Sequence, residues 1–134
     1  GQISFPGGRI ESADAGPWEA ALRETQEEIG LEPQFVTRAG YLQDHLVISG
    51  FRVTPAVGFV QPGFNLQLDE TEVENVFEVP LEFVLDVRNH LPRDRSIAGH
   101  TIITREIPYE GRQIWGATAN MLITFARLLR EVQA

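Results

Sequence analysis

Cysteine is absent from the sequence, which excludes disulfide bonds, thiolate catalysis and zinc sites built from cysteine. Long apolar runs are absent too, and none approaches the ~20 residues of a bilayer-spanning helix. Basic residues are few, with 11 against 19 acidic residues and a formal net charge of −8. We therefore expect neither a nucleic acid nor a membrane as partner, because both would need a basic surface. A cysteine-free chain fits a reducing compartment, and the expected location is cytoplasmic.

Internal repeats, low-complexity tracts and linkers are also lacking, so nothing divides the chain. Its 134 residues are enough for one sizeable core, and we expect a single domain over residues 1–134. The chain starts at Gly1 inside what reads as a strand and loop, so the natural protein is expected to extend further towards its N-terminus. The sequence leaves the oligomeric state open, with a homodimer among the options.

The clearest predicted element is a helix over residues 17–29. Pro17 suits the first helical position, Glu19 complements the positive end of the helix dipole, and Gly30 suits a left-handed cap. One stripe at helical spacing is expected to face the core, and it comprises Trp18, Leu22, Thr25 and Ile29.

The rest of the chain alternates between strand and helix patterns. Strands are predicted over residues 3–5, 35–42, 51–60, 73–79, 101–109 and 112–115, with a loop over 61–68. A short helix is expected over residues 80–85 and a closing helix over 117–132. The expected buried side of the closing helix comprises Met121, Phe125, Leu128, Leu129 and Val132. This interleaving predicts an α/β layered domain with a mixed sheet.

Glu24, Glu27 and Glu28 crowd one face of the first helix, because they are spaced i, i+3 and i+4. Like charges at i, i+4 cost ~0.2–0.5 kcal/mol per pair, and no basic residue between them offsets this cost. Magnesium prefers oxygen ligands and commonly bridges a few carboxylates to phosphates. Taken alone, such a cluster is more often an ordinary solvated surface, so the metal interpretation depends on its surroundings.

Two neighbouring features favour a ligand site. Arg23 can pair with Glu27 at i, i+4 and hold its rotamer, although a plain surface salt bridge would look the same. The Gly7-Gly8 turn lets the backbone approach a ligand closely and can offer a carbonyl oxygen to a metal, although Gly-Gly alone more often marks a tight turn.

The stretch from Gly8 to Leu31 resembles a Nudix box. The family pattern is Gly-x5-Glu-x7-Arg-Glu-U-x-Glu-Glu-x-Gly-U, where U is a bulky apolar residue. Gly8 opens it and residues 23–31 (RETQEEIGL) close it. Asp14 replaces the first Glu, eight residues rather than seven separate it from Arg23, and Thr25 replaces an apolar residue. The extra residue precedes the carboxylates, so their mutual geometry should be preserved.

A narrower resemblance is to the coenzyme A pyrophosphatase branch of that family. Residues 1–8 (GQISFPGG) are similar to the end of the motif that precedes the box in this branch, which also tolerates the insertion and the Asp. Residues 53–58, 76–81 and 115–119 look like further segments of it. The resemblance implies an α/β/α Nudix sandwich and hydrolysis of coenzyme A to 4′-phosphopantetheine and 3′,5′-adenosine bisphosphate.

The resemblance also implies residue roles and a Mg²⁺ or Mn²⁺ cofactor. Glu24 and Glu28 would be the principal metal ligands, Glu27 a third ligand or the general base, and the carbonyl of Gly7 or Gly8 a backbone ligand. Arg23 joins the catalytic set by holding Glu27.

Further candidates come from outside the box. Nudix enzymes often use an additional Glu from a later loop, and Glu72 in the acidic run 69–74 is the candidate, although each acid there is individually more often solvated. The 3′-phosphate of coenzyme A would favour an arginine. Nothing in the sequence chooses among Arg93, Arg95, Arg105 and Arg112. The histidines lack ligand spacing and are expected at the surface or in the core, namely His45, His90 and His100. Trp115 is expected in core or hairpin packing.

Two alternatives remain open. The same chemistry could act on ADP-ribose or a dinucleotide, or the chain could be a Nudix-like module that binds a nucleotide without turnover. Loss of a box carboxylate would favour the second alternative, yet all three are present.

Overall fold

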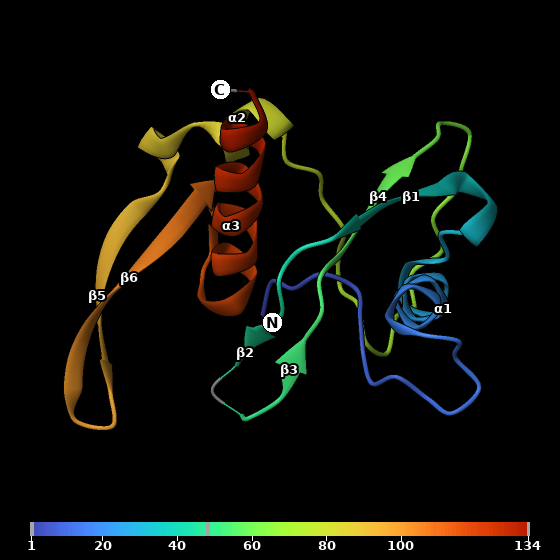
Figure 1. Cartoon of the computed structure of the whole chain (residues 1–134), viewed down its shortest axis with the longest axis horizontal. Helices are drawn as coiled ribbons and strands as arrows, with labels where there is room; N and C mark the ends of the chain where they lie inside the picture. The colour runs from blue at the N-terminus through green and yellow to red at the C-terminus, as the bar shows by residue number, and fades with distance from the viewer. Residues whose placement is uncertain (1, 48, 134) are drawn as a thin grey trace. The chain divides into compact units, whose positions relative to one another are not determined.

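The computed structural model describes residues 2–47 and 49–133 (Figure 1). Contacts divide the chain into a first unit, Ile3–Phe77, and a second unit, Glu78–Ala134. Both contain helices and strands, so the expected α/β class is confirmed. All ladders between described residues are antiparallel, and the parallel pairing that a mixed sheet would add is not among them.

Helix α1, Pro17–Ile29, has the predicted bounds. Pro17 occupies the first turn, and Gly30 caps the C-terminus in the left-handed conformation with φ 74°. The N-cap residue is Gly16, which has no side chain to accept from the first turn. Instead the Trp18 N–H donates to the Tyr41 hydroxyl over 3.0 Å, so a distant aromatic residue satisfies one of the free helical donors.

The first unit pairs β1, Val36–Tyr41, with β4, Ala56–Val60, next to α1 (Figure 1). The short helix η1, Pro33–Phe35, leads into β1. A β carbon on Gly58 would lie 2.7 Å from Val36 Cγ1 and 3.1 Å from Trp18 Cη2. Glycine is therefore required where the indole of α1 crosses β4.

The predicted strand over 51–60 is two strands. β3, Arg52–Val53, pairs with β2, His45–Leu46, whereas β4 starts only at Ala56. Thr54 and Pro55 separate them, because Pro55 has no N–H to donate and the Thr54 hydroxyl donates to Asp44 over 2.8 Å.

In the second unit, β5, Leu91–Ile97, β6, His100–Tyr109, and β7, Arg112–Ile114, form one sheet in that order. Both hairpins close through two residues with positive φ, first Ala98-Gly99 at 51° and 80°, then Glu110-Gly111 at 47° and 77°. These values are typical of type I′ turns, whose twist matches that of the strands. β6 and β7 were predicted, but β5 was not.

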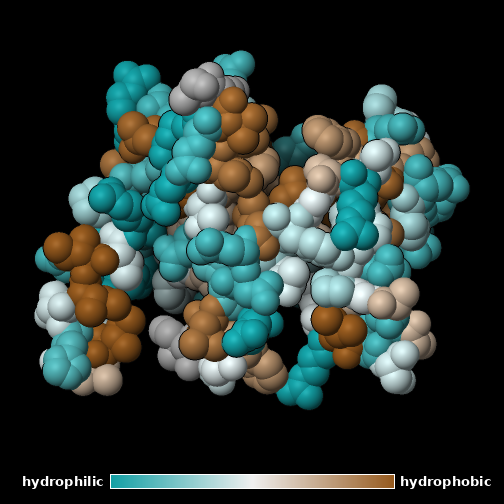
Figure 2. Space-filling view, in the orientation of Figure 1, coloured by the Kyte–Doolittle hydropathy of each residue, from teal (hydrophilic) through white to brown (hydrophobic). Residues whose placement is uncertain are grey.

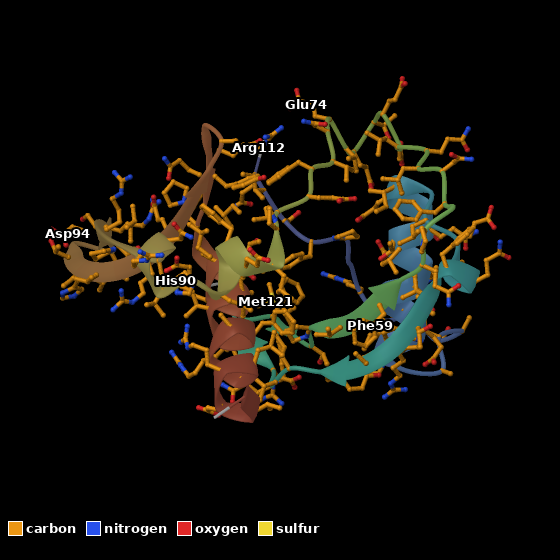
Figure 3. All side chains as sticks on the ribbon, turned by 90° about the horizontal axis from the view of Figure 1, so that it is seen from above. Phe59, Glu74, His90, Asp94, Arg112 and Met121 are labelled. Atoms are coloured by element: carbon orange, nitrogen blue, oxygen red, sulfur yellow. The ribbon has the colours of Figure 1, made fainter. Side chains whose placement is uncertain are left out.

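The second unit has three further helical segments, α2, Leu81–Leu85, η2, Val87–Asn89, and α3, Gly116–Gln133 (Figure 1). Its core centres on Ile107 and Ile114, which face each other across β6 and β7 and are 0% and 2% exposed. Met121 of α3 is buried as expected (Figure 3). The prediction of its buried side is wrong at the C-terminal end, because Leu128 and Val132 are 43% and 74% exposed. At this end of the helix Arg130 donates to the Leu85 carbonyl of α2 over 3.4 Å.

Two predicted strands are wrong. Residues 3–5 and 73–79 join no ladder of the residues that the structure describes. In the second case a turn ends where the strand was expected to begin, since the Val73 N–H donates to the Asp69 carbonyl over 2.8 Å, and residues 75–79 are irregular. The predicted loop over 61–68 is confirmed. No helix of the described residues has the length and apolarity needed to cross a membrane.

The close contact at Gly58 predicts that Gly58→Val destabilises the first unit by ~1–3 kcal/mol, as overpacking of a well-filled site does. Urea denaturation measures the change in the free energy of unfolding. Gly7→Ala is the control, because a β carbon at Gly7 has nothing within 4 Å. An unfolding free energy for Gly58→Val equal to that of the wild type would contradict the packing described.

Candidate functional site

The three carboxylates near the C-terminal end of α1 differ in how far they are exposed. The Glu24 side chain is 17% exposed and that of Glu27 is 58% exposed, while Glu28 is half-buried. All three belong to the last turns of the helix, before the Gly30 cap. The predicted acidic face is therefore present, and its inner members are Glu24 and Glu28.

The Arg23 guanidinium donates hydrogen bonds to three carboxylates around it. Its Nε and Nη2 donate to the two Asp14 oxygens over 3.0 Å each, a bidentate pair. Its Nη1 donates to Glu24 over 2.8 Å and to Glu27 over 3.4 Å. The predicted Arg23–Glu27 pair is confirmed, but it is the longest of these contacts. The sequence reasoning missed the Arg23–Asp14 and Arg23–Glu24 pairs.

The Gly7-Gly8 turn lies directly against the carboxylates. The Gly7 N–H donates to Glu28 Oε2 over 3.2 Å. A β carbon on Gly8 would lie 2.6 Å from the Glu24 carboxyl carbon, so no other residue fits without displacing that side chain. The backbone of the turn thus contacts both inner carboxylates, as the close approach of glycine allows.

The acidic loop after β4 is held against the C-terminal end of α1. The Gln67 N–H donates to the Ile29 carbonyl and the Asp69 N–H to the Glu28 carbonyl, both over 2.8 Å. The Glu72 N–H in turn donates to the Asp69 carbonyl over 3.0 Å. These bonds satisfy free carbonyls of the helix end and position the loop beside Glu28.

The pKa of Glu28 is raised above its usual value. Burial of the carboxyl is the main cause, and the negative charges of Glu24 and Glu72 add to it, while the Gly7 N–H works in the opposite direction. Glu72 therefore lies close enough to repel Glu28. Glu72, the loop carboxylate predicted from the sequence, is thus one of the charges that act on Glu28.

The oxygen donors fit a hard divalent cation in their chemistry. A cation between Glu24, Glu28 and Glu72 would also relieve the repulsion that raises the pKa of Glu28. However, no group of three or more acidic or histidine side chains in the described part of the chain is arranged to hold a metal ion. Glu24 and Glu27 accept from Arg23 as well, so part of the negative charge of the helix face is already balanced.

The four arginines considered for a substrate phosphate all belong to the second unit. Arg93 and Arg95 both pair with Glu106, which is buried, and the guanidinium of Arg95 lies 4.3 Å from the ring centroid of Trp115. Arg105 donates to the His90 carbonyl. Each of these contacts joins parts of the second unit to one another.

The histidines lie where the sequence suggested. His90 is buried beside α2, with its Nε2 2.7 Å from the Val84 carbonyl oxygen (Figure 3). His45 and His100 are on strands of different units.

A family model described as NUDIX domain matches residues 1–99 of the chain. The chain is also similar to proteins named uncharacterized Nudix hydrolase NudL from Salmonella newport, Salmonella agona and Salmonella dublin. Each is 41% identical over 122 residues, which cover 91% of this chain and 64% of the relative. The chain thus spans less than two thirds of the length of these relatives.

The paired Asp14 makes stability depend on pH. Hydrogen bonds from Arg23, and then from the Glu11 N–H, lower the pKa of Asp14 below 3.8. Its ionised form therefore stabilises the fold above the pKa of the unfolded chain, and this contribution is lost as the pH falls through the lower folded value. We expect Asp14→Asn to be less stable than the wild type at pH 7, with a difference that narrows below pH 3.8.

Urea denaturation across this pH range provides the measurement. Asp94→Asn is the control, since Asp94 is exposed on β5 (Figure 3) and should shift stability little at any pH. A difference between Asp14→Asn and the wild type that stays constant with pH would contradict the pairing.

Proposed function

Because the chain belongs to the Nudix family, we propose that it hydrolyses a diphosphate linkage in a nucleoside diphosphate derivative with Mg²⁺ or Mn²⁺. The observation that carries the proposal is that the Gly7-Gly8 turn and the acidic loop are both held against the end of α1 that bears Glu24 and Glu28. Burial and like charge disfavour the ionised form of Glu28 there. A divalent cation makes such an arrangement favourable.

Glu24, Glu28 and the loop residue Glu72 are the proposed metal ligands, together with the Gly8 carbonyl. Glu27 is the most exposed of the box carboxylates and serves as a further ligand or as the general base. A bound divalent cation would neutralise charge on the diphosphate oxygens and activate water.

The protein groups keep the carboxylates in place. Arg23 is held by the bidentate Asp14 pair and fixes Glu24 and Glu27 from one side. The Gly7 N–H donates to Glu28 from the other side. This arrangement orients the acidic side chains before a substrate arrives, which lowers the cost of organising them in the transition state.

Coenzyme A or one of its thioesters is the proposed substrate. Water attacks one phosphorus of the diphosphate, the bond from that phosphorus to the bridging oxygen breaks, and a proton is lost from the water. The products are 4′-phosphopantetheine and 3′,5′-adenosine bisphosphate. Support comes from the segments similar to the coenzyme A pyrophosphatase branch, which are residues 1–8, 53–58 and 115–119.

We predict that the protein hydrolyses coenzyme A with magnesium and that chelation abolishes the reaction. Chromatography resolves the two products, and ADP-ribose and a dinucleotide run in parallel identify the preferred substrate. Faster hydrolysis of ADP-ribose or the dinucleotide than of coenzyme A would identify that compound as the substrate of the same reaction. Nucleotide binding without product after prolonged incubation would instead support a binding module.

Glu28→Gln should leave the fold intact and lower turnover by ~10³-fold or more, because charge stabilisation by a metal is worth several kcal/mol. Steady-state kinetics measure the loss, and thermal unfolding checks the fold. Glu19→Gln is the matched control, being an exposed glutamate in the first turn of the same helix. Near wild-type turnover by Glu28→Gln would refute the assignment.

Glu72→Gln tests the contribution of the loop. We expect it to raise the magnesium concentration needed for half-maximal rate, since one ligand charge is lost. Glu74→Gln, on the same loop and exposed (Figure 3), should leave this concentration unchanged. The same magnesium concentration for half-maximal rate in both variants would show that Glu72 is not a metal ligand.

A further inference from the structure

The first unit carries the whole net charge of the chain. Residues 3–77 contain twelve acidic residues and four arginines, which gives −8, whereas residues 78–134 contain seven of each and are neutral. The net negative charge of the first unit therefore repels a diphosphate that approaches it. Any arginine there that is not bound to a carboxylate is a natural partner for a phosphate.

Arg9 is such an arginine. Arg23 is bound to carboxylates, and Arg38 lies over the Tyr41 and Trp18 rings, 4.7 and 5.8 Å from their centroids. The Arg9 guanidinium lies over the Phe51 ring, 5.1 Å from its centroid. Among the residues that the structure describes, no carboxylate is within ion-pair distance of Arg9.

The main chain of Arg9 is fixed beside the acidic site. Arg9 directly follows Gly8, whose backbone contacts the Glu24 carboxylate. The Arg9 carbonyl accepts from Arg23 Nη2 over 3.0 Å. The same arginine that holds Asp14 and Glu24 thus holds the backbone from which the Arg9 side chain projects.

Phe51 is presented by the hairpin of β2 and β3. The Val47 N–H donates to the Phe51 carbonyl over 3.0 Å, and the Gly50 N–H donates to the Val47 carbonyl over 2.9 Å. Phe51 is 54% exposed as a residue, so Arg9 covers only part of it. A large aromatic ring kept open to solvent next to a guanidinium can stack with a planar ligand.

We propose that Arg9 and Phe51 form the subsite that binds the nucleotide end of the substrate. The Arg9 guanidinium binds a phosphate, and the Phe51 ring contacts the nucleobase. The ligand class is a nucleoside diphosphate, because it joins a planar ring to an anion. This subsite rests on the proposed function for its role in turnover, but its binding of nucleotide can be measured separately.

Two probes separate the two contacts. ADP carries a base and a diphosphate, whereas inorganic pyrophosphate carries the diphosphate alone. Calorimetry with magnesium measures the Kd of each probe for the Glu28→Gln protein, in which turnover is suppressed, and for the same protein with one further substitution. The substitutions are Arg9→Gln, Phe51→Leu and, as matched control, Arg52→Gln.

Arg9→Gln should raise the Kd of both probes about tenfold. Phe51→Leu should raise the Kd of ADP about tenfold and leave the Kd of pyrophosphate unchanged. Arg52→Gln removes an equal charge from β3, directly after Phe51, and so tests the effect of net charge alone. It should change neither Kd. Thermal unfolding of each variant confirms that the fold is retained.

Unchanged ADP binding in Phe51→Leu, or an equal loss in Arg9→Gln and Arg52→Gln, would overturn the subsite. If the wild type hydrolyses a diphosphate and either of these results is found, the subsite fails and the proposed function stands. If no diphosphate is hydrolysed but the two variants weaken ADP as expected, the subsite stands and the hydrolase proposal fails.

Discussion

One guanidinium surrounded by carboxylates organises the first unit. Arg23 donates to Asp14, Glu24 and Glu27, and it also ties down the Arg9 carbonyl. Without this cation, the carboxylates of one helical face would repel one another over the short separations that i, i+3 and i+4 spacing imposes. The Arg23 side chain is itself only 23% exposed, so solvent screens these pairs less than it would on an open surface.

Most of the site could be predicted from local spacing, because its core is a single helix. The i, i+3 and i+4 positions of Glu24, Glu27 and Glu28 follow from helical geometry alone, and the Gly-Gly turn could be recognised by composition. What could not be predicted was the choice of partner. Asp14 competes with Glu27 for Arg23 and binds more closely, which depends on how the loop before α1 folds back. The Phe51 contact to Arg9 likewise depends on a tertiary approach that no spacing encodes.

The helices were easier to predict than the strands. α1 has proline, glycine and a periodic apolar stripe as independent signals, and its bounds agree with all three. β5 has Pro92 and three charged residues among its seven, so no apolar alternation marks it. The signal for β5 is the Ala98-Gly99 turn, which closes a hairpin with β6. This turn indicates a strand before it only when β6 is already known to follow. The strands wrongly predicted over 3–5 and 73–79 show the reverse case, in which β-branched and aromatic content is not matched by a ladder in the described part of the chain.

The central claim is that Glu24, Glu28 and Glu72 share a divalent cation, and direct binding of manganese tests it. Electron paramagnetic resonance of free Mn²⁺ titrated with the protein reports bound metal without substrate or turnover. The account predicts saturable binding by the wild type that magnesium displaces and that the Glu24→Gln/Glu28→Gln double variant loses. Equal Mn²⁺ binding by the wild type and a correctly folded double variant, or no binding by the wild type with ADP present, would contradict it.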